Sequence, residues 1–156
     1  MIADFFMIEE ISVKKLHPDA VLPQQATDRD SGYDLVAVED GKDVFDGDNY
    51  LYTEYNTGIS IAPPLGYHTE IIPRSSITKK NLILKNSFGL IDNGYRGPLM
   101  FRFHKTGDIN TTNIYYKGDK IGQILIRKTI HMPFVFVDEL GDTARGDGGF
   151  GSTDKK

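Results

Sequence analysis

Short runs of alternating or β-branched apolar residues, separated by turn residues, extend along most of the chain. Residues 55–61 alternate, residues 121–130 are rich in β-branched side chains, and residues 133–137 form another apolar run that reads as a strand. No stretch of about a dozen residues repeats its apolar positions with a helical period. Turn signals separate the runs at residues 63–66, 92–94, 105–108 and 117–119. Many short strands at close spacing predict an all-β fold, as a sandwich, a jelly roll or a barrel.

One short helix and one glycine-rich tail depart from this pattern. Ser75 or Ser76 is a suitable N-cap, and residues 77–82 are predicted to form about two helical turns. Residues 141–156 contain five glycines, few large apolar side chains and a charged end, which is typical of a mobile arm. We therefore expect a β core over residues 1–140 and a flexible C-terminal arm over residues 141–156.

Composition narrows the class of protein. A length of 156 residues favours one domain. Eight Tyr and nine Phe side chains are enough to build a hydrophobic core that needs no disulfide bonds. Cysteine is absent, which excludes a disulfide framework, a thiolate metal site and a cysteine nucleophile. The net charge of −4 argues against a general nucleic-acid binder. A few local donors can nevertheless hold a phosphate in an acidic protein.

The first eight residues are mostly apolar, and we expect them to form a first strand. They lack the basic lead of a signal peptide and are followed at once by Glu9 and Glu10. No run approaches the roughly 18 apolar residues that a membrane span requires. The pattern therefore predicts a soluble, intracellular protein of the cytoplasm or nucleus, without a membrane partner.

The tail contains a candidate phosphate-binding segment. Its glycines let the backbone approach an anion, Arg145 supplies a cation, and Ser152 and Thr153 add hydroxyl donors. Phe150 has no local core to join, so it is available to stack on a base. The segment lacks the Gly-Lys-Ser/Thr end of a Walker A motif. A plain glycine-rich tail explains the same composition.

Two internal segments place polar groups where chemistry is feasible. Arg74, Ser75 and Ser76 lie at the start of the predicted helix, where anions are favoured, although an ordinary N-cap is the simpler interpretation. Residues 86–97 resemble a β-hairpin in which Asp92 follows an apolar pair and can orient a water. A turn aspartate explains Asp92 equally well.

The remaining polar candidates are weaker. Asp34 and Gln123 each lie near the start of a predicted strand. The four histidines show no metal-site spacing, so structural or surface roles are expected for them.

Taken in order along the chain, five segments resemble the five motifs of the trimeric dUTPase family. The segments are residues 32–35 (GYDL), 73–76 (PRSS), 89–97 (GLIDNGYRG), 118–123 (GDKIGQ) and 145–153 (RGDGGFGST). The resemblance covers essentially the whole chain. One such motif would be a weak signal, whereas five in order at ordinary family spacing are a specific one.

Some positions depart from the commonest family pattern. Residues 76–78 read Ser-Ile-Thr where Gly-Leu-Ala is frequent, and residues 93–94 read Asn-Gly in place of a more acidic pair. Lys120 stands where Arg is usual, and Gly122 where Ala is usual. None of these differences removes a group that the chemistry requires, so they bear on details of phosphate contacts.

The resemblance implies a distorted jelly-roll or β-clip barrel that hydrolyses dUTP to dUMP and pyrophosphate with Mg²⁺. Asp92 would be the general base that activates a water for attack on the α-phosphorus. Tyr95 would pack under the deoxyribose and exclude a ribose 2′-hydroxyl. Asp34 would reach Mg²⁺ through a bound water. The implied substrate-binding residues are Arg74, Ser75, Ser76, Asn86, Gly89, Ile91, Tyr95, Gln123, Arg145, Phe150, Gly151, Ser152 and Thr153.

The resemblance also assigns roles within that set. Asn86, with the backbone of residues 87–90, would read the uracil edge, and Ser75 would donate near the α–β bridging oxygen. Arg74 and Gln123 would steady the phosphates. The residues of the tail would clasp the γ-phosphate while its aromatic ring stacks on uracil. Because family members build each site from three subunits, a homotrimer with shared active sites is implied.

Two alternatives remain. One is a dCTP deaminase, or a bifunctional deaminase and dUTPase, on the same fold; such relatives are expected to use a glutamate, so Asp92 and the Phe150 tail favour the plain dUTPase. The other is a non-catalytic nucleotide-binding regulator, for which a degraded motif would be the signal, and none is seen.

Overall fold

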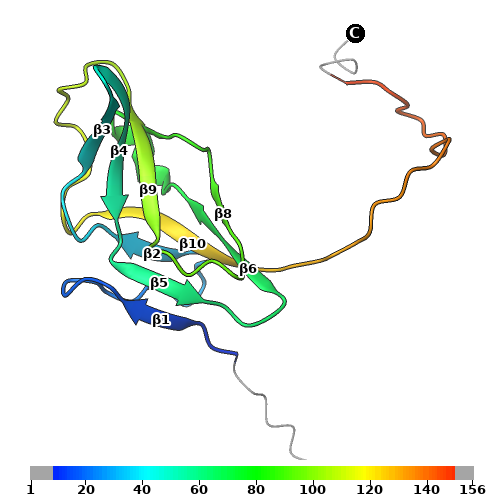
Figure 1. Ribbon diagram of the computed structural model, residues 1–156, viewed down its shortest axis with the longest axis horizontal. Coiled ribbons are helices and arrows are strands. Elements are labelled where there is room, and N and C mark those ends of the chain that lie inside the picture. The colour runs from blue at the N-terminus through cyan, green and yellow to red at the C-terminus, as the bar shows by residue number, and fades with distance from the viewer. Residues whose placement is uncertain (1–8, 150–156) are drawn as a thin grey trace, which may run out of the picture.

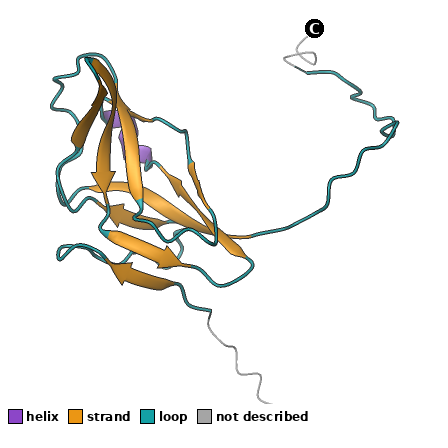
Figure 2. Ribbon diagram, in the orientation of Figure 1, coloured by secondary structure: helices purple, strands orange, loops and turns teal. Residues whose placement is uncertain are grey.

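The computed structural model describes residues 9–149, and strands make up nearly all the regular structure in that part of the chain (Figures 1 and 2). The all-β prediction is therefore confirmed. The elements are β1 (Ser12–Lys15), β2 (Tyr33–Val36), β3 (Lys42–Asp46), β4 (Asn49–Asn56), β5 (Ile59–Ala62), β6 (Tyr67–Ile72), η1 (Ser75–Lys79, a 3-10 helix), β7 (Leu82–Leu84), β8 (Gly89–Ile91), β9 (Met100–Lys105) and β10 (Lys120–Lys128).

Two four-stranded antiparallel sheets and one strand pair form a distorted jelly roll. One sheet has the order β2-β10-β6-β8, the other has the order β3-β4-β9-β7, and β1 pairs with β5. Neighbouring strands in the sheets are mostly distant in sequence, as Figure 1 shows for β10 between β2 and β6. This connectivity brings residues from the first, second and fourth of the five motifs together on β2, on β10 and just after β6.

The core contains side chains from both four-stranded sheets and from β5. Phe101 and Phe103 point to the same side of β9, and their rings stack with centroids 5.8 Å apart. Tyr55 of β4 meets Phe103 edge-on at 5.7 Å. Gly122 of β10 lets the two sheets approach, since a Cβ at this position would lie only 2.2 Å from the Phe101 ring.

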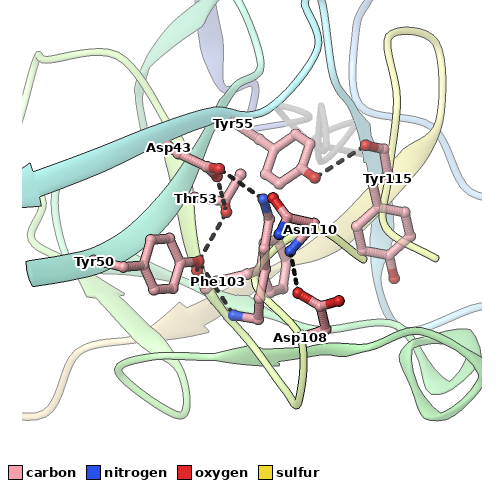
Figure 3. Close-up of polar contacts among 9 residues, drawn as sticks. Asp43, Tyr50, Thr53, Tyr55, Phe103, Asp108, Asn110 and Tyr115 are labelled. Carbon is pink, nitrogen blue, oxygen red and sulfur yellow. Dashed lines mark hydrogen bonds and ion pairs between the residues drawn. The ribbon is translucent and has the colours of Figure 1, made fainter. Parts of the chain in front are cut away.

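A polar cluster ties β3, β4 and β9 together (Figure 3). Lys105, with a side chain 8% exposed, donates to one Asp43 oxygen at 2.7 Å. The Thr53 hydroxyl donates to the other Asp43 oxygen at 2.6 Å and lies 2.8 Å from the Tyr50 hydroxyl. The nearly buried Lys105 ammonium is thus paired with the Asp43 carboxylate. Protein interiors tolerate a charge when it has such a partner.

The predicted helix over residues 77–82 is wrong in extent and type. The structure has a 3-10 helix over Ser75–Lys79, its N-cap is Arg74, and no side chain caps it. Leu82 is buried and belongs to β7, where it pairs with Lys105 of β9. Burial of this side chain in the sheet therefore ends the helix before a second turn forms.

The predicted β-hairpin over residues 86–97 is also wrong. Only Gly89–Ile91 forms a strand, and it pairs with β6 rather than with a following strand. After it, the Tyr95 N–H donates to the Asp92 carbonyl at 3.0 Å, which closes a turn. The sequence pattern predicted that the two halves of residues 86–97 pair with each other. In the structure, β8 pairs instead with β6, which lies earlier in the chain.

The strand predicted at residues 133–137 is absent, although residues 121–130 largely form β10 as expected. Figure 1 shows the chain leaving the core after β10. Phe134 and Phe136 are fully exposed, at 102% and 108%. No face of the described part of its own chain covers this segment, so its apolar side chains have no sheet to join.

The strand expected over residues 1–8 lies outside the described residues. In residues 9–149, no helix has the length and apolar character needed to cross a membrane.

Candidate active site

The Asp34 carboxylate is the centre of one group of predicted site residues. Arg74 Nε donates to Asp34 Oδ1 at 2.9 Å, and Gln123 Nε2 donates to the same oxygen at 3.2 Å. Lys120 Nζ lies 2.8 Å from Oδ2. The Asp34 side chain is only 4% exposed, whereas Arg74 and Lys120 are 31% and 48% exposed. The two cations therefore reach from a buried carboxylate towards solvent, where a phosphate can approach them.

Two opposing effects set the pKa of Asp34. Burial alone raises the pKa of this carboxyl, but hydrogen bonds from Lys120 and Gln123 and the positive charge of Arg74 outweigh it. The pKa therefore stays below its usual value, and Asp34 is ionised at neutral pH.

The strands explain how this group assembles. Asp34 lies on β2 directly opposite Gln123 on β10, and the backbone of Asp34 also forms a bridge to Gln24. Gly32 packs against Gln123, since a Cβ there would lie 3.2 Å from its side chain. Arg74 follows β6, the other neighbour of β10. Strand pairing thus joins the first, second and fourth motifs.

Ser75 and Ser76 open the 3-10 helix next to Arg74. Ser75 is exposed, and its carbonyl accepts a hydrogen bond from the Thr78 hydroxyl at 2.9 Å. Both serines therefore directly follow Arg74, which is a partner of Asp34.

A second group lines a cleft of about 560 Å³ beside β8. The predicted residues in its wall are Asn86, Gly89, Ile91, Asp92 and Tyr95. All of them come from the segment between β7 and the turn after β8. The structure thus brings the base-reading candidates and the candidate general base into one hollow.

The cleft depends on tight local packing. Gly89 lies against Ile71, and a Cβ at this position would come within 2.6 Å of that side chain. Ser87 adopts a left-handed conformation with φ of 64°, which turns the chain before β8. The Tyr95 hydroxyl donates to the Pro98 carbonyl at 3.1 Å and lies over Gly97, where any Cβ would collide with it.

The two groups lie apart within one chain. Gln123, which pairs with Asp34, lies opposite Ile72 at the end of β6 that leads to Arg74. Asp92 follows Ile91, which pairs with Thr69 nearer the other end of β6. The Asp34 group and the Asp92 cleft therefore lie at different places on the sheet, and Arg74 is not among the residues that line the cleft.

The tail residues are not joined to either group. Arg145 donates to the Gly148 carbonyl at 2.9 Å in an exposed turn of the extended segment after β10 (Figure 1). Phe150, Gly151, Ser152 and Thr153 lie outside the described residues.

The structure adds residues that sequence patterns did not single out as site residues. Lys120 was noted only as a departure from the family pattern, yet it is a direct partner of Asp34. Tyr52, Lys85 and Arg102 share the wall of the Asp92 cleft, and the Arg102 guanidinium lies 4.6 Å from the Tyr52 ring centroid. They come from β4, β9 and the end of β7, so no local motif could indicate them.

The described residues contain no group of three or more His, Asp or Glu that could hold a metal ion by themselves. Mg²⁺ commonly keeps several waters and binds one or two carboxylates together with substrate phosphates. A carboxylate offers about four acceptor positions, and Asp34 uses three on Arg74, Gln123 and Lys120. The remaining position fits a water on an ion that arrives with a triphosphate.

Comparisons with known proteins identify the family of this chain. Residues 19–154 match the family model described as dUTPase. The deoxyuridine 5′-triphosphate nucleotidohydrolase of Leptospira interrogans is 44% identical over 146 residues, which cover 92% of this chain and 98% of the relative. That of Thermobifida fusca is 39% identical over 144 residues, which cover 92% and 78%.

Solved structures show the same fold. A dUTPase of Staphylococcus bacteriophage 80alpha, studied with dUpNHpp, superposes with a TM-score of 0.72 at 23% identity, covering 92% of this chain and 98% of that chain. A mutant dUTPase of phage phi11, described with a structural Mg(II) ion, has a TM-score of 0.67 at 21% identity, covering 86% and 100%. The family match and the relatives above 30% identity decide the assignment. This chain belongs to the dUTPase family.

Proposed function

We propose that this dUTP diphosphatase converts dUTP into dUMP and pyrophosphate by directing a water at the α-phosphorus. The observation that carries the proposal is the Asp92 cleft, whose wall combines a carboxylate, an amide side chain and a tyrosine ring. A carboxylate within reach of a water acts as a general base, and such help contributes roughly 10²- to 10⁴-fold.

Different residues of the cleft would bind the base and the sugar of the nucleoside. Asn86 and the strand backbone at Gly89 and Ile91 would read the uracil edge, because a mismatched base leaves buried donors and acceptors unpaired. Tyr95 would pack under the deoxyribose. Its ring is held by the Pro98 carbonyl and by contact with Gly97, so it cannot easily make room for a 2′-hydroxyl.

The Asp34 group supports phosphate binding. Arg74 and Gln123 would steady the phosphates, and Ser75, with Ser76 beside it, would donate to the leaving pyrophosphate. Mg²⁺ bound to the triphosphate would neutralise charge that develops in the transition state. Asp34 would hold that ion through a water, and its lowered pKa keeps it ionised for this role.

The C-terminal residues would close the site. Arg145, Ser152 and Thr153 would bind the γ-phosphate, with Phe150 and Gly151 over the uracil. Support for this part is the composition of the tail. Closure of such an arm excludes water and completes the catalytic arrangement.

A homotrimer with shared active sites would unite the separated groups. The Asp92 cleft of one copy would face the Asp34 group of another. Phe134, Val135 and Phe136 are exposed in the segment after β10. Exposed apolar stretches of this kind mark protein–protein contacts. A groove of about 290 Å³ lined by Ile11, Val13, Leu22, Ile61, Ile124 and other residues offers an apolar surface for such a contact.

Substrate profiling tests the proposal against its alternatives. Purified protein with Mg²⁺ is assayed with dUTP, dCTP, the other dNTPs and UTP, and pyrophosphate and ammonia are measured. We expect pyrophosphate from dUTP alone. Ammonia from dCTP would favour the deaminase or bifunctional reading. A folded protein that binds dUTP without hydrolysing it would favour a nucleotide-binding regulator.

A further inference from the structure

The Asn93 side chain connects the turn that carries Asp92 to the loop before β6. Its Nδ2 atom lies 2.8 Å from the carbonyl oxygen of Pro64, 2.8 Å from that of Tyr67 and 3.2 Å from that of Pro63. Three carbonyl oxygens surround one nitrogen, so the environment accepts only a donor at this position. The amide group of Asn93 meets this requirement without adding a charge beside Asp92.

Asn93 acts where the sheet ends. The last pair between β8 and β6 joins Ile91 to Thr69. Beyond it, Asp92 leaves the sheet and accepts the Tyr95 N–H at 3.0 Å across the turn. Beyond this last pair, the hydrogen bonds of the Asn93 side chain connect the Asp92 turn to the start of β6 and to the loop before it.

The orientation of this turn matters because Asp92 borders two hollows. One is the cleft of about 560 Å³ that also contains Asn86 and Tyr95. The other, of about 380 Å³, lies on the side of Tyr67 and His68 and contains Asn93 itself. A turn without its tether is free to direct the carboxylate towards either hollow, and only the first contains the nucleoside-binding candidates.

We propose that Asn93 is a positioning residue that holds the Asp92 turn so that the general base faces the nucleotide cleft. The inference rests on the proposed function and deepens it. Asn93 touches no substrate in this scheme, and its whole effect on the reaction passes through Asp92.

The test replaces Asn93 by Leu, which is similar in size but has no donor. We expect kcat for dUTP to fall about 10- to 100-fold, because misplacing a catalytic group by about 1 Å costs on the order of 10²-fold. We expect KM and the affinity for a non-hydrolysable dUTP analogue to change less than about threefold. The matched control is Asn81→Leu, which removes a tether to Thr111 of 2.9 Å at another loop and should leave kcat unchanged.

The decisive measurement repeats Asn93→Leu in the Asp92→Asn background. If Asn93 acts through Asp92, the second substitution causes no further loss of kcat. An equal loss in both backgrounds, or no loss in the wild-type background, would overturn the inference. Should Asn93→Leu not fold, the same pair of measurements on Asn93→Ser decides.

The outcomes also separate this inference from the proposed function. If the wild-type protein does not hydrolyse dUTP, the proposed function fails. If it does, and Asp92→Asn is inactive while Asn93→Leu keeps full kcat, only the role of Asn93 fails.

Discussion

Asp92 is exposed at the end of β8, and no residue within 9–149 donates a hydrogen bond to its carboxylate. A carboxylate in this state can accept hydrogen bonds from water at all of its positions, whereas Asp34, which is buried and held by two cations and Gln123, keeps only one such position. The two acids therefore suit different tasks, one as a base and one as an outer partner of a metal ion.

Asp92→Asn removes the base and keeps the shape of the side chain. We expect kcat for dUTP to fall at least about 10²-fold, because general-base help is lost. Binding of a non-hydrolysable analogue, measured by calorimetry, should be retained. Unchanged turnover would show that another group activates the water.

Tyr95→Ala removes the ring that is proposed to lie under the deoxyribose. We expect UTP to compete better, because the space that excluded a 2′-hydroxyl opens. The measurement is the ratio of kcat/KM for dUTP to that for UTP. A ratio equal to that of the wild-type protein would contradict the steric role.

Gly122→Ala places a Cβ 2.2 Å from the Phe101 ring and 2.9 Å from the Ile72 carbonyl. Overpacking of this kind typically costs about 1–3 kcal/mol, and we expect the free energy of unfolding to fall by that amount. Denaturant unfolding measures it, with Gly141→Ala, whose Cβ meets nothing within 4 Å, as the control. If Gly122→Ala and Gly141→Ala were equally stable, the Phe101 contact would not limit the residue at position 122.

At the scale of elements, the segment after β10 contrasts with the rest of the described chain. Residues 129–149 form no strand, and most of their side chains are exposed. Apolar residues occupy its first part and glycines its second. The first part is suited to contact with another copy, and the second to contact with a ligand.

Truncation after Asp142 tests the second part. We expect the shortened protein to keep its fold and the mass of its assembly in solution, because residues 143–149, the described part of what is removed, contain no strand. Hydrolysis of dUTP should be severely reduced, because the arm no longer closes over the triphosphate. Steady-state kinetics measure the loss, and full activity would exclude a role for the arm.

For the whole molecule, the separation of the Asp34 group from the Asp92 cleft bears on the proposed assembly. In the proposed homotrimer, Arg74 of one copy and Asp92 of another would serve the same nucleotide.

Mixing two inactive variants tests this assembly. Arg74→Ala and Asp92→Asn are each expected to be inactive. After denaturation and refolding together in equal amounts, random assembly should restore about a quarter of the sites. Activity is measured against each variant refolded alone, and a mass measurement reports whether the assembly is a trimer. No regain of activity in a mixed trimer would place both residues in sites within single chains.

Part of the protein could be predicted from sequence alone. Strand patterns, glycine positions and the order of five motifs indicated the all-β fold, the candidate base Asp92 and the site candidates Asp34, Arg74 and Gln123. These features are local, because strand alternation, turn chemistry and motif spacing are properties of adjacent residues.

Only the tertiary structure decided what those residues contact. The pairing of β8 with β6, Lys120 as a partner of Asp34, and the Asn93 tether all join segments that are distant in sequence. The strand predicted at residues 133–137 failed for the same reason, since an apolar run forms a strand only where a neighbour is available to pair with it. Pairing and burial depend on the rest of the chain, so local pattern could not determine them.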